Sequence, residues 1–577
     1  MNIELILKKD IKICALKSKI PKKFISFIQI TSKSKIGNYQ INGIIKISKL
    51  LKINTEELSK KFIYYLQDNN IYKKIKYSAP GFINIFFNEI WLSEEIEKII
   101  YSNSLGIPKE KPKNIIIDYS SPNMAKEMHV GHLRSTILGD VMARTLSFLK
   151  HNVIRINHIG DWGFQFGLLI AYLKKKYINQ INKKLSLKDL EKYYQKSKKL
   201  YENDNTFKIK VTKCILKLQN KNQKYIKLWK KIVKITIKQN KKIYNQLNIT
   251  LKNKHNIGES FYIKYLSNII LDLKKKKIAT KKNGNTIIYL KNIKNKNGQP
   301  MGVIIQKKDT SFLYSTIDLA CLKYRINKLN ANRIIYYTDV RQKQHLKQIE
   351  IIAKKAKYIP KNFNLEHHIF GMVLTKNNKP FKTRDGKLIK LSSLINESIK
   401  KSKKIIKHKN PNFNKKKISQ LSKIIGISAI KYADLSKNRE KNYIFNWNNM
   451  LSFHGNTALY IQYTYTRIQS IIRKSKFSPL KINKKIILTN NIEIKLSIKI
   501  LQFEETIQNI KNNGMPHILC LYLFQISSLF SIFYEKYPII YAKRINIQKS
   551  RLKLSFLIAR IIKLGLKLLG IKTVNYM

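Results

Sequence analysis

Acidic residues are scarce in this sequence of 577 residues: 33 aspartates and glutamates stand against 114 lysines and arginines, a formal net charge of +81. Such a surplus predicts a polyanionic partner, with nucleic acid first. Lysine, isoleucine and asparagine are used heavily throughout, as in proteins from AT-rich genomes, so the charge does not locate the binding surface. The few acids are informative because each stands against a basic background.

Cysteines and long apolar runs are also rare, and both features bear on the cellular location of the protein. The four cysteines are scattered and form no C-x-x-C pair: Cys14, Cys214, Cys321 and Cys520. This argues against a zinc ribbon or a disulfide framework and fits a reducing cytosol. Charged Glu4 and Asp10 lie where a signal peptide would be apolar. The longest uncharged run, Ile518–Tyr534, contains Gln525 and three serines and predicts a buried bundle helix. We expect a cytoplasmic protein with no membrane partner.

The most informative stretch runs from Asn114 to His132 and reads N-I-I-I-D-Y-S-S-P-N-M-A-K-E-M-H-V-G-H. Three consecutive isoleucines in Asn114–Asp118 predict a short buried strand, and the serines, proline and asparagine that follow predict a loop. From His129 the pattern is helical. The stretch therefore predicts a strand, a loop and the beginning of a helix.

Two histidines, His129 and His132, are three residues apart on this helix and share one face. The free amides and the positive dipole end of a helix N-terminus favour an anion, most naturally a phosphate. Gly131 leaves room for a ligand, and Lys126 adds a positive charge from the loop. Paired histidines can also hold a metal, but no Cys or Asp/Glu cluster nearby completes such a site, so we predict none. Two ordinary surface histidines remain an alternative, because an H-x-G-H tetrapeptide alone is a weak signal.

The rest of the chain predicts a parallel sheet with helices. Asn152–Asn157 is a second strand, and strand–helix–strand at this spacing begins a doubly wound fold. No G-x-G-x-x-G follows, which argues against a dinucleotide. Tyr172–Leu247 has apolar residues at helical spacing and predicts amphipathic helices. Ile334–Asp339 predicts another buried strand, leading to Arg341–His345 at the ligand-binding edge of the sheet.

The string S-S-P-N-M-A-K-E-M-H-V-G-H-L-R-S-T closely resembles the signature loop of arginyl-tRNA synthetases, with H-V-G-H where class I synthetases carry His-Ile-Gly-His. Four further segments resemble this family in order: the ten residues from His158, the Tyr-x-x-x-Asp-Leu-Ala pattern from Tyr314, Phe453–Arg467 and Ala559–Met577. The second class I signature is degenerate, because Pro380–Arg384 lacks its second lysine. In the family a lysine just before the histidine motif then compensates, and Lys126 stands there.

The resemblance covers essentially the whole chain and implies an α/β protein of three domains. Residues 1–106 are expected to form an α+β accessory domain that touches the outer corner of tRNA. Residues 107–440 are expected to form a Rossmann-like, doubly wound parallel-sheet catalytic domain with a helical insertion at about 172–290. Residues 441–577 are expected to form an all-α bundle that grips the anticodon stem and loop. There Tyr460, Tyr463 and Tyr465 stack on bases or, as is commoner on an apolar helix, lie in the core.

The resemblance also implies the activity, that of an arginine–tRNA ligase of bacterial type. Such an enzyme activates L-arginine with ATP, which brings its own Mg²⁺, and forms arginyl-adenylate. It then transfers arginine to the 3′-terminal adenosine of tRNA(Arg), and activation itself requires bound tRNA. We expect a monomer.

The family's functional positions carry over to this sequence as expectations. Catalytic roles fall to His129, His132, Lys126, Lys382 and Arg384. Contacts with ATP fall to the same two histidines and to Pro122, Gly131, His345 and Thr383. The arginine pocket falls to Asn123, Glu259, Tyr314, Asp318 and Gln342, with Gln344 a near neighbour of the last. Carboxylates suit the planar, permanently charged guanidinium of arginine.

Two other functions remain open on the sequence alone. A small-molecule nucleotidyltransferase shares the H-x-G-H loop, but it would need neither an accessory domain nor a helical bundle. A non-catalytic RNA-binding protein derived from a synthetase would keep the basic surface, but loss of His129, Glu259 or Asp318 would be expected, and all three are present.

Overall fold

The computed structural model describes residues 2–31, 36–67, 69–176, 185–294, 297–375, 377 and 389–577, and the chain folds into two compact units. The first unit contains Met1–Lys109, Ser452–Lys567 and Lys572–Met577. The second contains Glu110–Leu451 together with Leu568–Ile571, so a short piece near the C-terminus belongs with the middle of the chain.

An antiparallel sheet in the order β1-β2-β4-β3 organises the N-terminal part of the first unit. The elements are α1 (Ile3–Lys17), α2 (Lys22–Ile25), β1 (Gln29–Thr31), β2 (Tyr39–Asn42), α3 (Ile44–Leu51), α4 (Thr55–Gln67), β3 (Tyr72–Ser78), β4 (Phe82–Phe87) and α5 (Glu89–Ile100). The expected α+β character is confirmed. Helix α5 begins at Glu89 because the Asn88 side chain accepts the Ile90 N–H at 2.9 Å and caps it.

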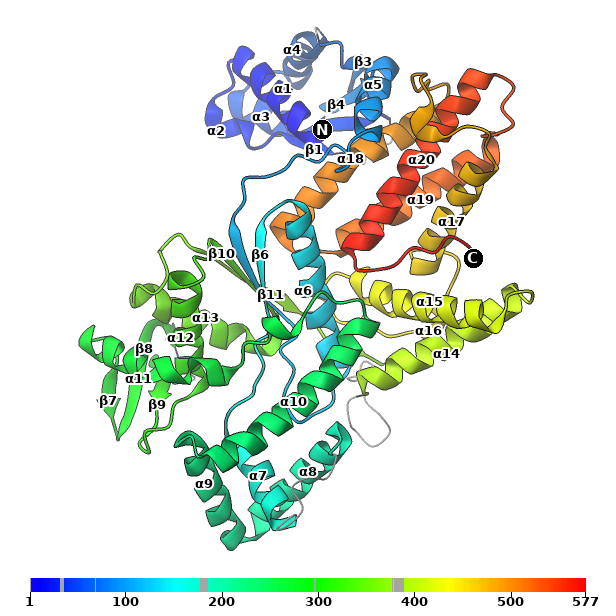
Figure 1. The fold of residues 1–577 in the computed structure, drawn as a ribbon. Helices are drawn as coiled ribbons and strands as arrows, with labels where there is room; N and C mark the ends of the chain where they lie inside the picture. Colours follow the sequence, from blue (N-terminus) through cyan, green and yellow to red (C-terminus); the bar gives the residue numbers. More distant parts are fainter. Residues whose placement is uncertain are drawn as a thin grey trace. The chain divides into compact units, whose positions relative to one another are not determined.

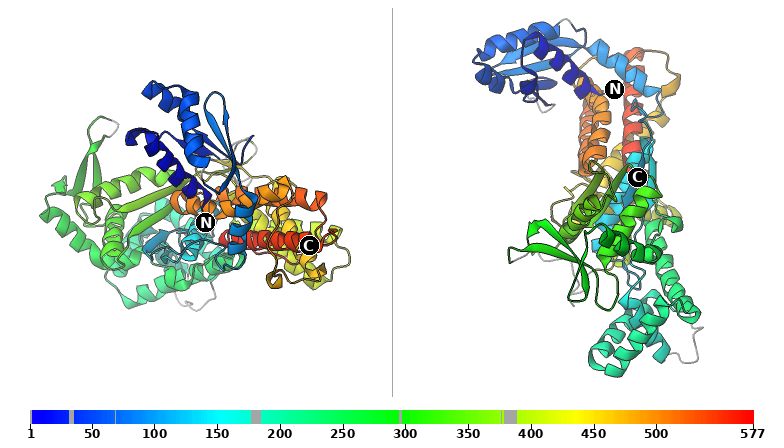
Figure 2. Two further views of the ribbon diagram at one scale, coloured as in Figure 1. Left: turned by 90° about the horizontal axis from the view of Figure 1, so that it is seen from above. Right: turned by 90° about the vertical axis from the view of Figure 1, so that its left-hand side faces the viewer.

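Helices alone build the C-terminal part of the first unit. They are α17 (Ala458–Lys474), α18 (Asn491–Asn513), α19 (His517–Lys536) and α20 (Ile545–Leu568), with the 3₁₀ turn η3 (Pro479–Lys481), and the four helices lie side by side (Figures 1 and 2). Among the described residues α19 is the one helix long and apolar enough to cross a membrane, and it packs against α17 and α18 as a bundle helix does. Tyr465 is buried and Tyr463 is 38% exposed, so the tyrosines of α17 divide between core and surface.

A four-stranded parallel sheet forms the centre of the second unit, in the order β11-β10-β5-β6. The strands are β5 (Asn114–Asp118), β6 (Asn152–Ile156), β10 (Arg333–Asp339) and β11 (Asn364–Phe370). Helix α6 (Val130–Phe148) links β5 to β6, and the isoleucines of β5 are buried. The predicted doubly wound sheet is confirmed, because the chain moves outward from β5 to β6 and then to β10 on its other side.

Between β6 and β10 the chain forms a helical group and then a small sheet (Figure 1). The helices are α7 (Phe164–Lys176), α8 (Leu187–Asn203), α9 (Asn205–Gln219), α10 (Gln223–Gln246), α11 (Glu259–Lys275) and α12 (Tyr314–Asn327), with the turn η1 (Asn253–His255). The strands are β7 (Thr280–Lys282), β8 (Asn285–Lys294) and β9 (Pro300–Gln306), paired antiparallel. The range 172–290 is therefore not wholly helical, since β7 and part of β8 fall within it.

The second unit is completed by elements that follow β10. They are η2 (Val340–Gln342), α13 (Lys343–Lys355), β12 (Val373–Leu374), α14 (Leu391–Lys409), α15 (Lys415–Leu435), β13 (Tyr443–Ile444) and α16 (Trp447–Met450). β12 pairs with β13 in parallel, and α14 packs against α15.

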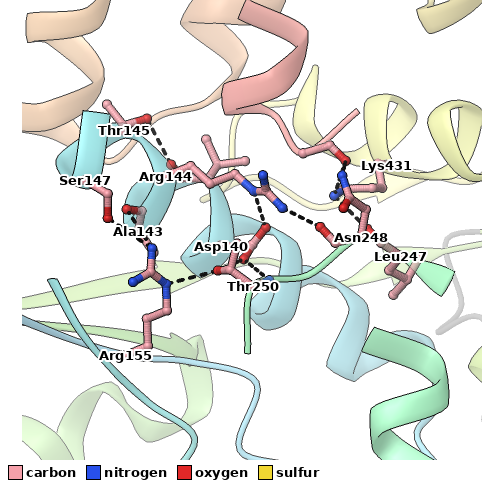
Figure 3. A network of polar contacts seen from close by, with 12 residues as sticks. Asp140, Ala143, Arg144, Thr145, Ser147, Arg155, Leu247, Asn248, Thr250 and Lys431 are labelled. Atoms are coloured by element: carbon pink, nitrogen blue, oxygen red, sulfur yellow. Dashed lines mark hydrogen bonds and ion pairs between the residues drawn. The ribbon is translucent and has the colours of Figure 1, made fainter. Parts of the chain in front are cut away.

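A buried polar network anchors the middle of α6 (Figure 3). Asp140 accepts the Thr250 N–H at 2.7 Å and pairs with Arg144 at 2.7 Å. Lys431 of α15 donates to the carbonyls of Leu247 and Gly570, both at 2.9 Å. The end of α10, helix α15 and the segment Leu568–Ile571 therefore meet beside α6. Because a buried carboxylate left without partners is costly, this network holds the middle of α6 in place.

Lys431 makes the stability of this junction depend on pH. Burial lowers the pKa of its amino group to about 7, whereas an unfolded lysine titrates near about 10.4. Between these values the unfolded chain binds more protons, so stability rises with pH. In urea unfolding followed by tryptophan fluorescence, the stability of the wild type relative to Lys431→Met should rise by about 1.4 kcal/mol per unit between pH 7.5 and 9.5. Parallel pH curves for the two proteins would contradict this assignment.

Candidate functional site

The loops that follow β5 and β10 meet where the strand order of the parallel sheet reverses. β5 and β10 are neighbours and parallel, with Ile117 opposite Ile335, so their carboxyl ends lie at the same edge. In open α/β sheets ligands bind at such a switch point. The segments 119–129 and 340–345 therefore form the candidate ligand-binding site.

The side chains of the two histidines accept backbone N–H groups at the N-terminus of α6. The His132 Nδ1 accepts the backbone N–H of His129 at 3.1 Å, and the His129 Nδ1 accepts that of Gly131 at 3.1 Å. Each neutral ring must then carry its proton on Nε2. His129 is the N-cap rather than a first-turn residue, and the ring centroids are only 3.9 Å apart. The pair presents two N–H donors on one side of the turn.

Burial and neighbouring cations keep both rings neutral. Burial, aided by the adjacent His129, lowers the pKa of His132 to about 3. Burial and the charge of Lys126 lower the pKa of His129 as well, and Arg341 contributes in the same direction. The Lys126 ammonium lies 4.8 Å from the centre of the Tyr194 ring on α8. The turn thus combines neutral donors with nearby positive charge, which suits a phosphate.

The segment 389–391 runs antiparallel beside this turn. Val130 N–H donates to the Ile389 carbonyl at 3.0 Å, and Leu391 N–H donates to that of Met128 at 2.9 Å. Lys390 forms ion pairs with Glu127 and, at 3.2 Å, with Glu191 of α8. The predicted residues Lys382, Thr383 and Arg384 lie outside the described residues.

A group of acids lies beside Asn123. Asn123 forms a parallel bridge with Gly160, and a Cβ placed at Gly160 would be 3.8 Å from Glu259 Oε1 and 4.0 Å from Asn123 Oδ1. Burial raises the pKa of Glu259 to about 7, against the opposing charge of His158 and with the charges of Asp161 and Asp318 contributing to the rise. Three carboxylates so close together are stabilised by a bound cation.

Asp318 connects this acidic group to the loop after β10. The His345 Nε2 lies 2.6 Å from Asp318 Oδ2, and this bond raises the pKa of His345. A residue predicted for ATP and one predicted for arginine are therefore direct partners. Tyr314, the first residue of α12, is 67% exposed, and Gln342 ends η2 on the surface. Pro122 is buried and Gly131 exposed.

Asp161 is a structural member of the site that the sequence-based prediction omitted. Its carboxylate accepts the Ser260 N–H at 2.9 Å and the Ser260 hydroxyl at 2.7 Å, and so caps α11. A Cβ at Gly258 would come within 2.3 Å of this carboxylate, so only glycine fits there. The signal was present in the H-I-G-D-W-G string, but the partner lies 99 residues away.

Arg325 and Asp118 form a second omitted pair behind the site. Arg325 Nη2 lies 2.6 Å from Asp118 Oδ2, and both side chains are buried. The ion pair ties α12, which carries Asp318, to the end of β5.

Comparisons with known proteins agree along the whole chain. Residues 95–447 match the family description "tRNA synthetases class I (R), catalytic domain", residues 2–87 "Arginyl tRNA synthetase N terminal domain" and residues 461–577 "DALR anticodon binding domain". The arginine–tRNA ligase of Buchnera aphidicola subsp. Acyrthosiphon pisum (strain Tuc7) is 56% identical over 577 residues, 100% of both chains. The arginyl-tRNA synthetase of Plasmodium falciparum has a similar structure, with a TM-score of 0.85 at 32% identity, covering 100% of this chain and 99% of that one. The Thermus thermophilus enzyme shares the fold at 18% identity, with a TM-score of 0.81 and 100% of both chains covered.

Proposed function

The chain belongs to the arginyl-tRNA synthetases, the class I ligases that activate arginine with ATP and join it to tRNA, and from this premise we propose which of its residues carry the reaction. In the first step the carboxylate of arginine attacks the α-phosphate of ATP and pyrophosphate leaves. In the second step the arginyl group passes to the 3′-terminal adenosine of tRNA(Arg) and AMP is released. A non-catalytic RNA-binding role is not favoured.

His129 and His132 are proposed to stabilise the phosphate under attack. The observation that carries this role is that both Nδ1 atoms accept backbone N–H groups, which leaves both Nε2–H groups free to donate. A phosphate that gains negative charge in the transition state is stabilised by donors already in place, and one such donor contributes about 3 kcal/mol. Gly131 lets the nucleotide approach the turn, and Pro122 borders it.

Positively charged side chains of this chain are proposed to balance the rest of the negative charge on the nucleotide. Lys126, Lys382 and Arg384 are proposed to face the leaving pyrophosphate, with Thr383 beside them. His345 completes the ATP set, and its bond to Asp318 orients that carboxylate. Mg²⁺ belongs to the substrate, because it enters bound to the phosphates of ATP.

Asn123, Glu259, Tyr314, Asp318 and Gln342 are proposed to form the arginine pocket. Glu259 and Asp318 would bind the guanidinium, which fits the raised pKa of Glu259. Asn123 lies on the same side of Gly160 as Glu259. Tyr314 would flank the substrate, and Gln342 would form the wall toward its amino group.

The wider organisation is proposed on the same premise. Residues 1–106, 107–440 and 441–577 are assigned to the accessory, catalytic and anticodon-binding domains. The protein would act as a cytoplasmic monomer, without a membrane. An ATP–pyrophosphate exchange assay tests the activity: label should enter ATP only with arginine, and only when tRNA is present. Exchange with a different amino acid, or none at all, would reject the proposed function.

Lys126 is expected to contribute more to activation than Lys382. The second signature of this chain is degenerate, and the charge of Lys126 already acts on both histidines. Single-turnover adenylate formation should therefore slow more in Lys126→Ala than in Lys382→Ala. The reverse order would transfer the main electrostatic role to the second signature.

A further inference from the structure

The loop between β5 and the histidine turn contains two successive residues with left-handed backbone. Ser120 has φ +74° and Ser121 has φ +44°. Residues other than glycine adopt this region rarely, and they persist there only where the surroundings hold them. Asn123 follows two residues later, so the backbone at Ser120–Ser121 determines where Asn123 stands.

Asn157, just beyond the end of β6, holds Ser121 directly. It is 1% exposed, and its Oδ1 accepts the Ser121 N–H at 2.9 Å. Because a backbone N–H can only donate, this bond fixes which end of the amide is oxygen. The Nδ2 end then donates to Asn256 Oδ1 at 2.7 Å and to the Tyr244 hydroxyl at 3.3 Å. The whole amide is engaged.

A line of hydroxyls continues from Tyr244 to the histidine turn. The Tyr244 hydroxyl lies 2.7 Å from that of Ser120, which lies 2.8 Å from that of Thr136. The Thr136 hydroxyl also donates to the His132 carbonyl at 2.6 Å. The Asn157 amide and these three hydroxyls therefore form one connected line of hydrogen bonds that ends at the first turn of α6.

We propose that Asn157 and Tyr244 are positioning residues of the adenylation site. They hold the left-handed backbone of Ser120–Ser121, which places Asn123, and through Thr136 they hold the turn that carries His132. The inference rests on the proposed roles of Asn123 and His132. Since Tyr244 belongs to α10, its hydroxyl is one of the ties between the inserted helices and the site.

A small hollow of about 10 Å³ adjoins Asn157 and Tyr244 and is also lined by Asn240, Asn256 and Lys241. This is space for about one water molecule.

Two near-isosteric variants test the proposal. Asn157→Asp keeps the acceptor for Ser121 but cannot donate to Tyr244, and Tyr244→Phe removes a single oxygen. Each should slow single-turnover adenylate formation, measured per folded enzyme with arginine and tRNA saturating, by about tenfold or more. Tyr225→Phe is the matched control. It lies on the same helix and loses only the acceptor for Lys174, 2.8 Å away, so its rate should stay within twofold of the wild type.

The Ser121→Gly substitution distinguishes a positioning role of the network from a role in stability alone. Glycine adopts positive φ without side-chain strain, so Ser121→Gly should need the network less. Added to Tyr244→Phe it should recover at least threefold of the lost rate, relative to the single Ser121→Gly variant, which loses the bond from the Ser121 hydroxyl to Asp118 at 3.2 Å. Loss of packing at Tyr244 would not be repaired from Ser121.

The outcomes are distinct. Slow variants restored by Ser121→Gly support the proposal. Rates within twofold of the wild type, or slow rates that Ser121→Gly does not restore, overturn it. If the wild type itself fails to exchange pyrophosphate into ATP with arginine, the proposed function fails instead of the positioning role.

Discussion

Replacing His132 by asparagine will slow adenylate formation by about 10²-fold or more. The asparagine Oδ1 takes the place of the Nδ1 that accepts the His129 N–H, so the turn stays capped, while the Nε2–H donor is removed. A donor aimed at a phosphate acts mainly in the transition state, so the rate constant falls more than the affinity for ATP. The measurement is single-turnover activation with saturating arginine and tRNA.

His408→Asn is the control for this experiment. His408 lies exposed in the last turn of α14, so its replacement should leave the rate unchanged. His132→Ala should be slow as well and, in addition, less stable, since it loses the cap. Activation of His132→Asn near the wild-type rate would refute the role of this histidine.

The second large effect is expected in the arginine pocket. Glu259→Gln and Asp318→Asn should each reduce kcat/KM for arginine by about 10²-fold or more, because each removes one arm of a charge-assisted pair. Glu259→Gln should not affect binding of ATP alone, measured by calorimetry, whereas Asp318→Asn also changes the partner of His345. Unchanged KM for arginine in both variants would place the guanidinium elsewhere.

The pH dependence of KM for arginine distinguishes the contribution of Glu259 from that of the neighbouring acids. Its pKa in the free protein is about 7, and only the ionised carboxylate attracts a guanidinium. As the pH falls below 7 the carboxyl is increasingly protonated, so KM for arginine should rise by up to about tenfold per unit. Because glutamine does not titrate, the profile of Glu259→Gln should be flatter. Equal slopes would assign the titration to another group.

Lysine should be rejected by about 10⁴-fold without a separate editing module. Its compact ammonium cannot form two parallel hydrogen bonds to a carboxylate, so the acids around Glu259 would remain partly unpaired in a desolvated site. Mischarging of tRNA with lysine, measured against arginine under identical conditions, checks the ratio. A ratio of only 10-fold to 10²-fold would mean that charge alone selects the substrate.

Local sequence determined the elements that carry this site. β5 has the bounds predicted from its isoleucines, and α6 follows the loop as its helical pattern indicates. These elements depend on residues close in the chain, where apolar spacing and turn residues leave few alternatives. The order of strands, loops and helices, and with it the edge of the sheet that binds ligands, was therefore predictable.

Tertiary structure decided the partners of the side chains. Asp318 bonds to His345, Asp161 caps α11 at Ser260, and Lys390 joins Glu127 to α8. None of these pairings has a local signal, because the partners lie 27 to 263 residues apart.

The histidine turn shows most clearly what local sequence determined and what tertiary structure decided. The sequence by itself determined that His129 and His132 stand at the beginning of a helix that follows a buried strand. Only the folded chain decided that both rings are neutral and that the loop before them is held in left-handed backbone. Burial and distant hydrogen bonds control the protonation of a side chain and the strain of a backbone, and both arise only when remote segments pack together.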